Sequence, residues 1–246
     1  MGARLAGGAG RRDSATGNCV QGRDRPSTRP PRAPGTRVKR MLLLLPLVVL
    51  LVGCGGKKSD NASGGSSMKC EISGDKSKAN LIDLDDGKTH SVAVKTSKGD
   101  FTFDLATKTS PCTTASFAGL VDRGFFDGLT FHRIVPGFVI QGGDPEGNGS
   151  GGPGYSVVDK PPADTKYDKG LVAMAKTQTD PAGTSGSQFF VVTGDDTGLT
   201  PDYAVLGHVT DGMDVVEQIG KLGDANDPSG TPTEKVTIDK MELTSG

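Results

Sequence analysis

The chain has 246 residues and a formal charge of -1, but this value averages two unlike parts. Residues 1–40 carry nine Arg and one Lys against two Asp, whereas the remainder carries 18 basic and 27 acidic residues, a net charge of -9. Because Arg123 and Arg133 are the only arginines in that remainder, it lacks the basic stripe that a phosphate backbone requires, and we expect no nucleic-acid partner. All nine Phe lie between Phe101 and Phe190, which predicts one hydrophobic core there.

Residues 1–53 precede the predicted domain and have the composition of a disordered segment followed by a signal peptide. Residues 1–37 are rich in Arg, Gly and Pro without an apolar period, so we expect them to be disordered. Residues 38–53 have the features of a signal peptide, because the uncharged run at 42–52 is too short to cross a bilayer. A signal peptide that began at Met41 would lack a positive start, whereas one that began at Val38, read as an initiator, would have it. We therefore expect the printed start to lie too far upstream.

The signal peptide ends in Leu51-Val52-Gly53-Cys54, which resembles the bacterial lipobox, where the cysteine after the cleavage site is lipidated. Residues 54–88 would then form a lipid-anchored cysteine and a flexible tether, of which residues 55–67 would span roughly 20 Å. We expect an extracytoplasmic domain that is held at the bacterial cell membrane by its N-terminal lipid. A buried core helix followed by a chance cysteine is the alternative.

The chain has four cysteines. Signal-peptide cleavage would remove Cys19 and the lipid would block Cys54, which leaves Cys70 and Cys112 in an oxidising compartment, where pairing is usual. We expect these two to form a disulfide that ties the segment before the domain to the first helix. The alternative is that Cys112, in the first turn of a helix, is a free and reactive thiol.

Residues 89–246 carry the patterns of one folded domain. Residues 91–96 and 100–105 alternate apolar and polar side chains, which predicts a hairpin with one buried face. Ser110 and Pro111 predict a helix start, and Gly124 closes the apolar stripe that follows. Further strands are predicted over residues 129–134, 138–141, 171–175, 188–192, 204–209 and 235–243, with a second helix over 213–222. This mainly β pattern predicts a closed or nearly closed antiparallel β-barrel.

Two stretches in this domain are the least random, Phe131-His-Arg-Ile-Val-Pro-Gly-Phe-Val-Ile-Gln-Gly-Gly-Asp144 and Gly183-Thr-Ser-Gly-Ser-Gln-Phe-Phe-Val191. Together they resemble the signatures of the cyclophilin family of peptidyl-prolyl cis/trans isomerases, and supporting segments follow in family order between residues 92 and 243. The resemblance implies a closed eight-stranded antiparallel β-barrel capped by two α-helices, with a hydrophobic groove on its outside. It also implies a rotamase that needs no cofactor and no metal.

The residue types suit this reaction. Rotation about an Xaa-Pro bond has a barrier of about 18–20 kcal/mol, because the amide loses resonance as it twists. An apolar slot that holds the proline ring, with a fixed hydrogen-bond donor at the imide, would lower it. The resemblance makes Arg133 the donor, with Phe138 and Gln141 completing the catalytic set. It assigns substrate binding to Val139, Ala175, Lys176, Gln188, Phe190, Leu199 and Tyr203, the backbone of Ala175 and Lys176 facing the peptide.

Three residues depart from the family pattern at the rim of the slot. Gly198 stands where many eukaryotic members have Trp, Tyr203 where they have His, and Lys176 where they usually have Asn. Because Gly198 removes a wall and a donor, we expect weak binding of cyclosporin-type inhibitors but retained turnover.

Other site signals are weaker. Asp144, Glu146 and Asn148 resemble the start of a calcium loop, but Tyr155 stands at the twelfth position, where such a loop has Glu. His132 has no Cys or carboxylate at ligand spacing, and we expect it to be a packing residue with satisfied ring nitrogens.

We therefore expect a monomeric isomerase that acts on Pro-containing segments of unfolded, secreted or cell-envelope proteins. The alternative from another class is a non-catalytic chaperone or scaffold module, which would hold the same segments without turnover.

Overall fold

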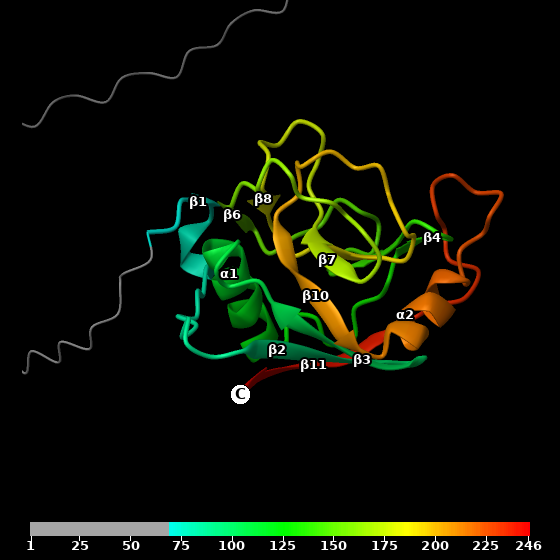
Figure 1. Ribbon diagram of the computed structural model, residues 1–246, viewed down its shortest axis with the longest axis horizontal. Coiled ribbons are helices and arrows are strands. Elements are labelled where there is room, and N and C mark those ends of the chain that lie inside the picture. The colour runs from blue at the N-terminus through cyan, green and yellow to red at the C-terminus, as the bar shows by residue number, and fades with distance from the viewer. Residues whose placement is uncertain (1–68) are drawn as a thin grey trace, which may run out of the picture. The chain divides into compact units, whose positions relative to one another are not determined.

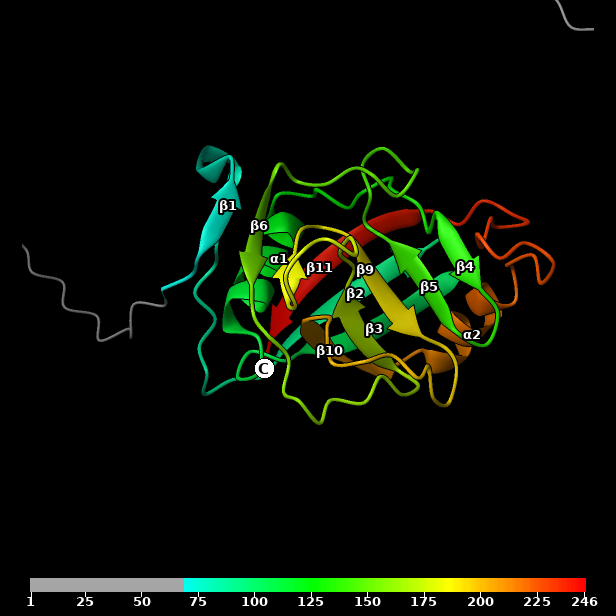
Figure 2. The same ribbon diagram turned by 90° about the horizontal axis from the view of Figure 1, so that it is seen from above.

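The computed structural model describes residues 69–246, so the expected signal peptide and Cys54 lie outside the described residues. An eight-stranded antiparallel sheet has the order β11-β2-β3-β10-β7-β9-β5-β4, and a three-stranded sheet has the order β1-β6-β8. The large sheet curls around the core (Figures 1 and 2). The elements in chain order are β1 (Ile72–Gly74), the 3-10 turn η1 (Lys76–Lys78), β2 (His90–Thr96), β3 (Gly99–Leu105), α1 (Pro111–Asp122), β4 (Arg133–Val135), β5 (Val139–Gly142), β6 (Tyr155–Val158), β7 (Leu171–Met174), β8 (Thr184–Ser185), β9 (Phe189–Val192), β10 (Val205–Asp211), α2 (Met213–Gly220) and β11 (Ile238–Ser245).

The predicted hairpin is formed by β2 and β3, and it supplies one wall of the core. Val92 pairs with Phe103, and Val94 pairs with Phe101, so the apolar members of both alternating patterns share one buried face. The core continues as a cluster of aromatic rings around Phe117 on α1, whose ring centroid lies 4.6 Å from that of Phe126 and 5.6 Å from that of Phe189. Burial of these rings contributes on the order of 2 kcal/mol each.

The two helices lie at opposite ends of the curled sheet (Figure 1). α1 begins with Pro111 in its first turn, as expected, but the Ser110 side chain makes no cap hydrogen bond. Instead, the Ser110 carbonyl accepts from the backbone N–H and the hydroxyl of Thr114. α2 ends at Gly220, two residues before the predicted end. Within residues 69–246, no helix has the length and apolar character that crossing a bilayer requires.

The large sheet is an open half-barrel, so the expected closed barrel is wrong. Its edge strands, β4 and β11, do not pair with each other. β4 is three residues long, and the Ile134 N–H on its free side donates to the Gly230 carbonyl of a loop. The segment before β4 approaches the start of β11 through an isolated bridge between Thr130 and Thr237 and through backbone hydrogen bonds of residues 128–131 with residues 236–238. The short edge strand is therefore covered by a loop, which protects it without closing the barrel.

The folded part begins before residue 89, where we expected the tether to end. β1 pairs in antiparallel register with β6, with Ser73 opposite Ser156. Figure 2 shows β1 alongside β6 at the edge of the molecule. The sequence carries little sign of this strand, because β1 has three residues and its partner lies more than eighty positions away.

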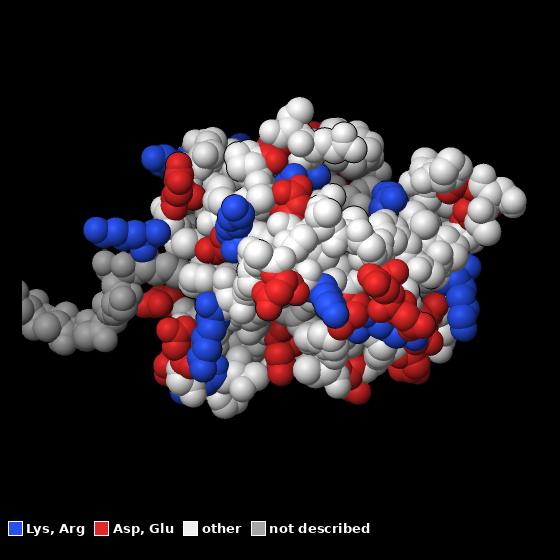
Figure 3. Space-filling model, turned by 45° about the horizontal axis from the view of Figure 1, so that its top comes forward, with Lys and Arg blue, Asp and Glu red and all other residues white. Residues whose placement is uncertain are grey.

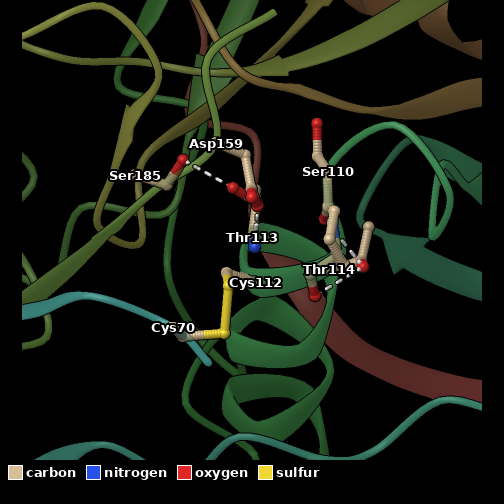
Figure 4. Close-up of a disulfide and its surroundings, with 8 residues drawn as sticks. Cys70, Ser110, Cys112, Thr113, Thr114, Asp159 and Ser185 are labelled. Atoms are coloured by element: carbon tan, nitrogen blue, oxygen red, sulfur yellow. Dashed lines mark hydrogen bonds between the residues drawn. A yellow bond between two sulfur atoms is a disulfide. The ribbon is translucent and has the colours of Figure 1, made fainter. Parts of the chain in front are cut away.

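Cys70 and Cys112 are joined by a disulfide in the structure, the pairing expected from the sequence. Their Cα atoms are 5.5 Å apart, and their sequence separation is 42. Figure 4 shows that the bond connects the N-terminal segment to the first turn of α1. In the next position, the Thr113 N–H donates to the Asp159 carboxylate at 2.6 Å. The disulfide therefore fixes the segment that leads into β1 against the body of the domain.

Candidate active site

A row of side chains runs across the outer face of the large sheet. Arg133 on β4 pairs with Gln141 on β5, and Gln141 pairs with Phe190 on β9. Phe190 in turn pairs with Ala173 on β7. Ile134, next to Arg133, is fully buried in the core, so Arg133 lies on the opposite face of its strand. The strand registers thus bring together an arginine, an amide and an aromatic ring from separate parts of the chain.

The residues expected to form the proline slot make a hydrophobic cluster separate from the core. Phe190 and Val139 are 5% and 2% exposed, so they form its buried floor, whereas Phe138 and Leu199 are half-buried. The Arg133 guanidinium carbon lies 5.9 Å from the centroid of the Phe138 ring. The complete cluster is Val139, Tyr167, Leu171, Ala173, Phe190 and Val192, with Phe138, Ala175, Leu199, Tyr203 and Val205 packed against it.

The two glutamines of the predicted site contact each other. The Gln141 side-chain N–H donates to the Gln188 side-chain oxygen at 3.0 Å. The Gln188 side-chain N–H group donates to the carbonyls of Gly149 at 3.0 Å and Gly151 at 2.9 Å. These bonds fix the orientation of both amides, so Gln141 is held beside Arg133 in a defined geometry.

The loop that supplies these carbonyls is organised by the buried Asp144. Its carboxylate accepts from the backbone N–H groups of Glu146 at 2.8 Å and Asn148 at 3.0 Å. Burial acts to raise the pKa of Asp144, but these hydrogen bonds together with that from Gly149 hold it below its ordinary value. The carboxylate that opened the calcium-like pattern therefore binds its own loop. Within residues 69–246, no group of three or more His, Cys, Asp or Glu side chains is arranged to hold a metal.

Lys176 and Ala175 lie at the end of β7, beside the slot. The Lys176 ammonium contacts the Asp202 carboxylate at 2.6 Å, and its side chain is 3% exposed. It also lies 5.5 Å from the centroid of the Tyr203 ring. The charge is therefore neutralised inside the protein, and the Ala175 N–H is already donated to the Gln188 carbonyl. The Ala175 N–H is thus used inside the protein, in a backbone hydrogen bond to Gln188.

Tyr203 packs against Tyr167, a residue that no sequence motif indicated. The Tyr167 hydroxyl donates to the Tyr203 carbonyl at 2.6 Å and accepts from the Tyr203 N–H at 3.0 Å. The Tyr203 ring meets Phe190 edge to face, with centroids 5.5 Å apart. Burial raises the pKa of Tyr167, so its hydroxyl stays protonated and holds this corner of the slot. One of three tyrosines in the chain, Tyr167 lies in a loop without a motif.

Gly198 lies in open space, whereas the ring nitrogens of His132 are buried. A Cβ at Gly198 would have no atom within 4 Å, so the rim is open there. Both ring nitrogens of His132 are buried and, among residues 69–246, neither makes a well-formed hydrogen bond, which differs from the satisfied packing residue that we expected. Burial lowers its pKa, with Asp144 acting against and Arg133 adding to this shift.

A pocket of about 710 Å³ adjoins the slot. It shares Gln141, Ala175, Lys176 and Gln188 with the predicted site. Its other lining residues are mostly small and polar, with Glu146 and Asp180 among them. Acidic and basic side chains are interspersed over the face in Figure 3, without a large basic patch there. The site thus combines an apolar slot, an arginine beside it and a polar pocket.

Comparison with known proteins agrees with this geometry. Residues 91–243 match the model of the family described as cyclophilin type peptidyl-prolyl cis-trans isomerase. The probable peptidyl-prolyl cis-trans isomerase A of Mycobacterium leprae is 37% identical over 166 residues, which cover 60% of this chain and 88% of that protein. The peptidyl-prolyl cis-trans isomerase B of Bacillus subtilis is 41% identical over 118 residues, covering 48% and 80%.

A solved cyclophilin type peptidyl-prolyl cis-trans isomerase of Cryptosporidium parvum aligns with a TM-score of 0.57 and 30% identity, covering 64% of this chain and 99% of that one. The same protein has been solved in the presence of the dipeptide Ala-Pro, with a TM-score of 0.56 and 29% identity, covering 63% and 99%. The chain belongs to the cyclophilin-type peptidyl-prolyl cis-trans isomerase family.

Proposed function

We propose that the protein accelerates cis/trans rotation of Xaa-Pro bonds in secreted or cell-envelope proteins, with Arg133 as the donor to the twisted imide. The observation that carries this proposal is the register that sets Arg133 beside Gln141 and next to the apolar floor formed by Phe190. The relatives' names and the Ala-Pro dipeptide of the Cryptosporidium parvum structure support the reaction and the proline ligand.

The proposed mechanism follows from what each group offers. The slot buries the proline ring and so favours binding of any Pro-containing segment. As the imide twists, its nitrogen becomes pyramidal, and the lone pair that was shared with the carbonyl becomes localised on the nitrogen. The Arg133 guanidinium then donates a hydrogen bond to this lone pair. Because this bond forms in the twisted state and not in either planar state, it lowers the barrier and leaves the ground states unchanged. The Gln141 side chain keeps the guanidinium and the substrate backbone in place.

The proposed location rests on sequence features outside the described residues. The apolar run before Cys54 and the tether after it support a lipid anchor on the outer side of the bacterial cell membrane. The disulfide of the domain suits an oxidising compartment. We propose that the domain acts there as a monomer on Pro-containing segments of proteins that are still folding.

The first prediction tests Arg133. Arg133→Ala should lower kcat/KM for an Xaa-Pro tetrapeptide by about 100-fold, on the order of 3 kcal/mol, because a donor of the twisted state is removed. Arg133→Lys should also be impaired, since Lys lacks the rigid fork of donors. Peptide affinity should change much less, because the apolar floor remains. A protease-coupled assay measures the rate, and fluorescence titration measures the affinity.

The matched control is Arg123→Ala, which removes the other arginine of the described residues. Its guanidinium donates to the Lys78 carbonyl on the surface, away from the slot, so activity should be retained. Circular dichroism checks that each variant folds. If Arg133→Ala keeps more than about half of the wild-type activity, Arg133 is not the donor. If the wild-type domain binds the peptide and leaves the slow isomerisation phase unchanged, the protein is a binding module.

A further inference from the structure

One wall of the polar pocket comes from a segment outside the family-matched region. The family model matches residues 91–243, whereas Ser73 and Gly74 on β1 line the pocket. Ser156 of β6, which pairs with Ser73, and Ser187 line the same pocket. The N-terminal segment therefore contributes a surface to the same pocket that Gln141 and Gln188 border.

β1 is held in this position by several contacts. Its register on β6 sets Ser73 opposite Ser156 and Gly74 opposite Tyr155. The Asp75 N–H donates to the Gly154 carbonyl at 2.9 Å. Gly74 has φ +83°, and a Cβ there would lie 2.7 Å from the Gly154 carbonyl oxygen, so only glycine allows this close approach. Together with the disulfide, these contacts make β1 a fixed wall.

The pocket is placed to receive part of a substrate whose proline occupies the slot. Gln141, Ala175 and Gln188 border the pocket, and Gln141 also lies in the row between Arg133 and Phe190. An extended chain advances about 3.3 Å per residue, so side chains within about three residues of the proline can reach the pocket. The substrate's flanking residues thus pass β1 as they enter or leave the slot.

The lining determines what such a side chain must be. Ser73, Ser156 and Gly186 leave space because they are small, and the hydroxyl and carbonyl groups around them offer hydrogen bonds. Three charged residues also line the pocket. Lys176 is buried against Asp202, the Asp180 carboxylate accepts from the N–H and the hydroxyl of Thr177, and the Glu146 carboxylate accepts from the Ser150 hydroxyl. A long, polar side chain fills this volume and satisfies these groups, whereas an alanine leaves it to water.

We propose that β1 is a specificity element of the isomerase, in which Ser73 forms the wall of a subsite for a long polar side chain that flanks the substrate's proline. This inference rests on the proposed function, since it takes the slot as the proline site. It assigns a role in substrate selection to a segment that precedes the family-matched domain. The disulfide between Cys70 and Cys112 then helps to hold β1 in position beside the pocket.

The second prediction compares two peptides of equal length, one with Gln and one with Ala at the positions around a single proline. In the wild type, kcat/KM and affinity should favour the Gln peptide by about fivefold, roughly 1 kcal/mol by the tenfold per 1.4 kcal/mol relation. Ser73→Trp should abolish this preference, because the indole fills the subsite. Ser73→Leu, a smaller intrusion, should reduce it. The measurements are protease-coupled rates and dissociation constants on the same samples.

The control is Lys76→Trp, which adds the same ring to the neighbouring turn η1, at an exposed residue outside the pocket lining. It should keep the wild-type preference. If the wild type and all variants show the same preference for the Gln peptide over the Ala peptide, in kcat/KM and in affinity, then β1 is not a specificity element. The proposed function would still hold in that case, provided that turnover depends on Arg133. Loss of turnover of both peptides by the wild type would instead overturn the proposed function, and the dissociation constants would still test the subsite.

Discussion

At the scale of single residues, the site is organised by hydrogen bonds that link its side chains to one another and to the backbone of a neighbouring loop. Asp144 holds the loop whose carbonyls orient Gln188, and Gln188 orients Gln141. The Tyr167 hydroxyl likewise holds the backbone of Tyr203, at the side of the slot, through two hydrogen bonds. A buried polar group whose partner is removed costs about 1–3 kcal/mol, so these links also stabilise the fold. This hydrogen-bonded network fixes the two glutamines, and Arg133 lies beside Gln141 in the strand register with its guanidinium near the Phe138 ring.

The third prediction concerns His132. Burial lowers its pKa below the ordinary value of 6.5, so the folded chain binds fewer protons than the unfolded chain between the two pKa values. Stability due to the neutral ring is therefore present above about pH 6.5 and is lost as pH falls through that window. His132→Phe should lose less stability than the wild type between about pH 7 and pH 5. Urea unfolding at both pH values measures the difference, and parallel losses would contradict it.

At the scale of elements, the sequence predicts those helices and strands that are determined by a local pattern of residues. The β2–β3 hairpin and the start of α1 follow from alternation and from Pro111. Most residues of the candidate site were predicted through their motifs, and the strand registers bring them together. What the sequence could not predict depends on distant partners. β1 requires β6, the edge of β4 is covered by the loop at Gly230, and Lys176 is neutralised by Asp202.

The fourth prediction concerns the disulfide that fastens β1. Closing a loop with a sequence separation of 42 restricts the unfolded chain, and reduction should lower the free energy of unfolding by roughly 2–4 kcal/mol. Reduction should also weaken the preference for the Gln peptide, because Cys70 no longer holds the segment before β1. Urea unfolding with and without a thiol reductant measures the first effect, and the two-peptide assay measures the second.

The control for this prediction is the paired substitution of Cys70→Ser with Cys112→Ser. This variant should behave like the reduced wild type and should not respond to the reductant. Two free thiols in the oxidised, denatured domain would show that the bond does not form. An unchanged peptide preference in the paired variant would mean that the β1–β6 pairing holds the wall without it.

At the scale of the whole molecule, the proposed membrane attachment rests on sequence features that precede the described residues 69–246. The lipobox-like sequence that ends in Cys54 is the candidate. A lipid there would attach the domain to the membrane through the flexible residues 55–67. This tether would hold the domain just off the membrane surface. A single acyl chain anchors weakly, whereas the two chains of a diacylglycerol hold a protein stably.

The fifth prediction is that the mature chain begins at Cys54 and carries diacylglycerol. Mass spectrometry of the N-terminal peptide of the full chain, expressed in a bacterium, should give this mass. Cys54→Ala should leave a longer, unprocessed chain, because the peptidase requires the lipidated cysteine. Cys19→Ala is the matched control and should be processed like the wild type, since Cys19 precedes the expected start at Val38. An unmodified Cys54 would refute the anchor, and a precursor peptide from residues 1–37 would refute the start at Val38.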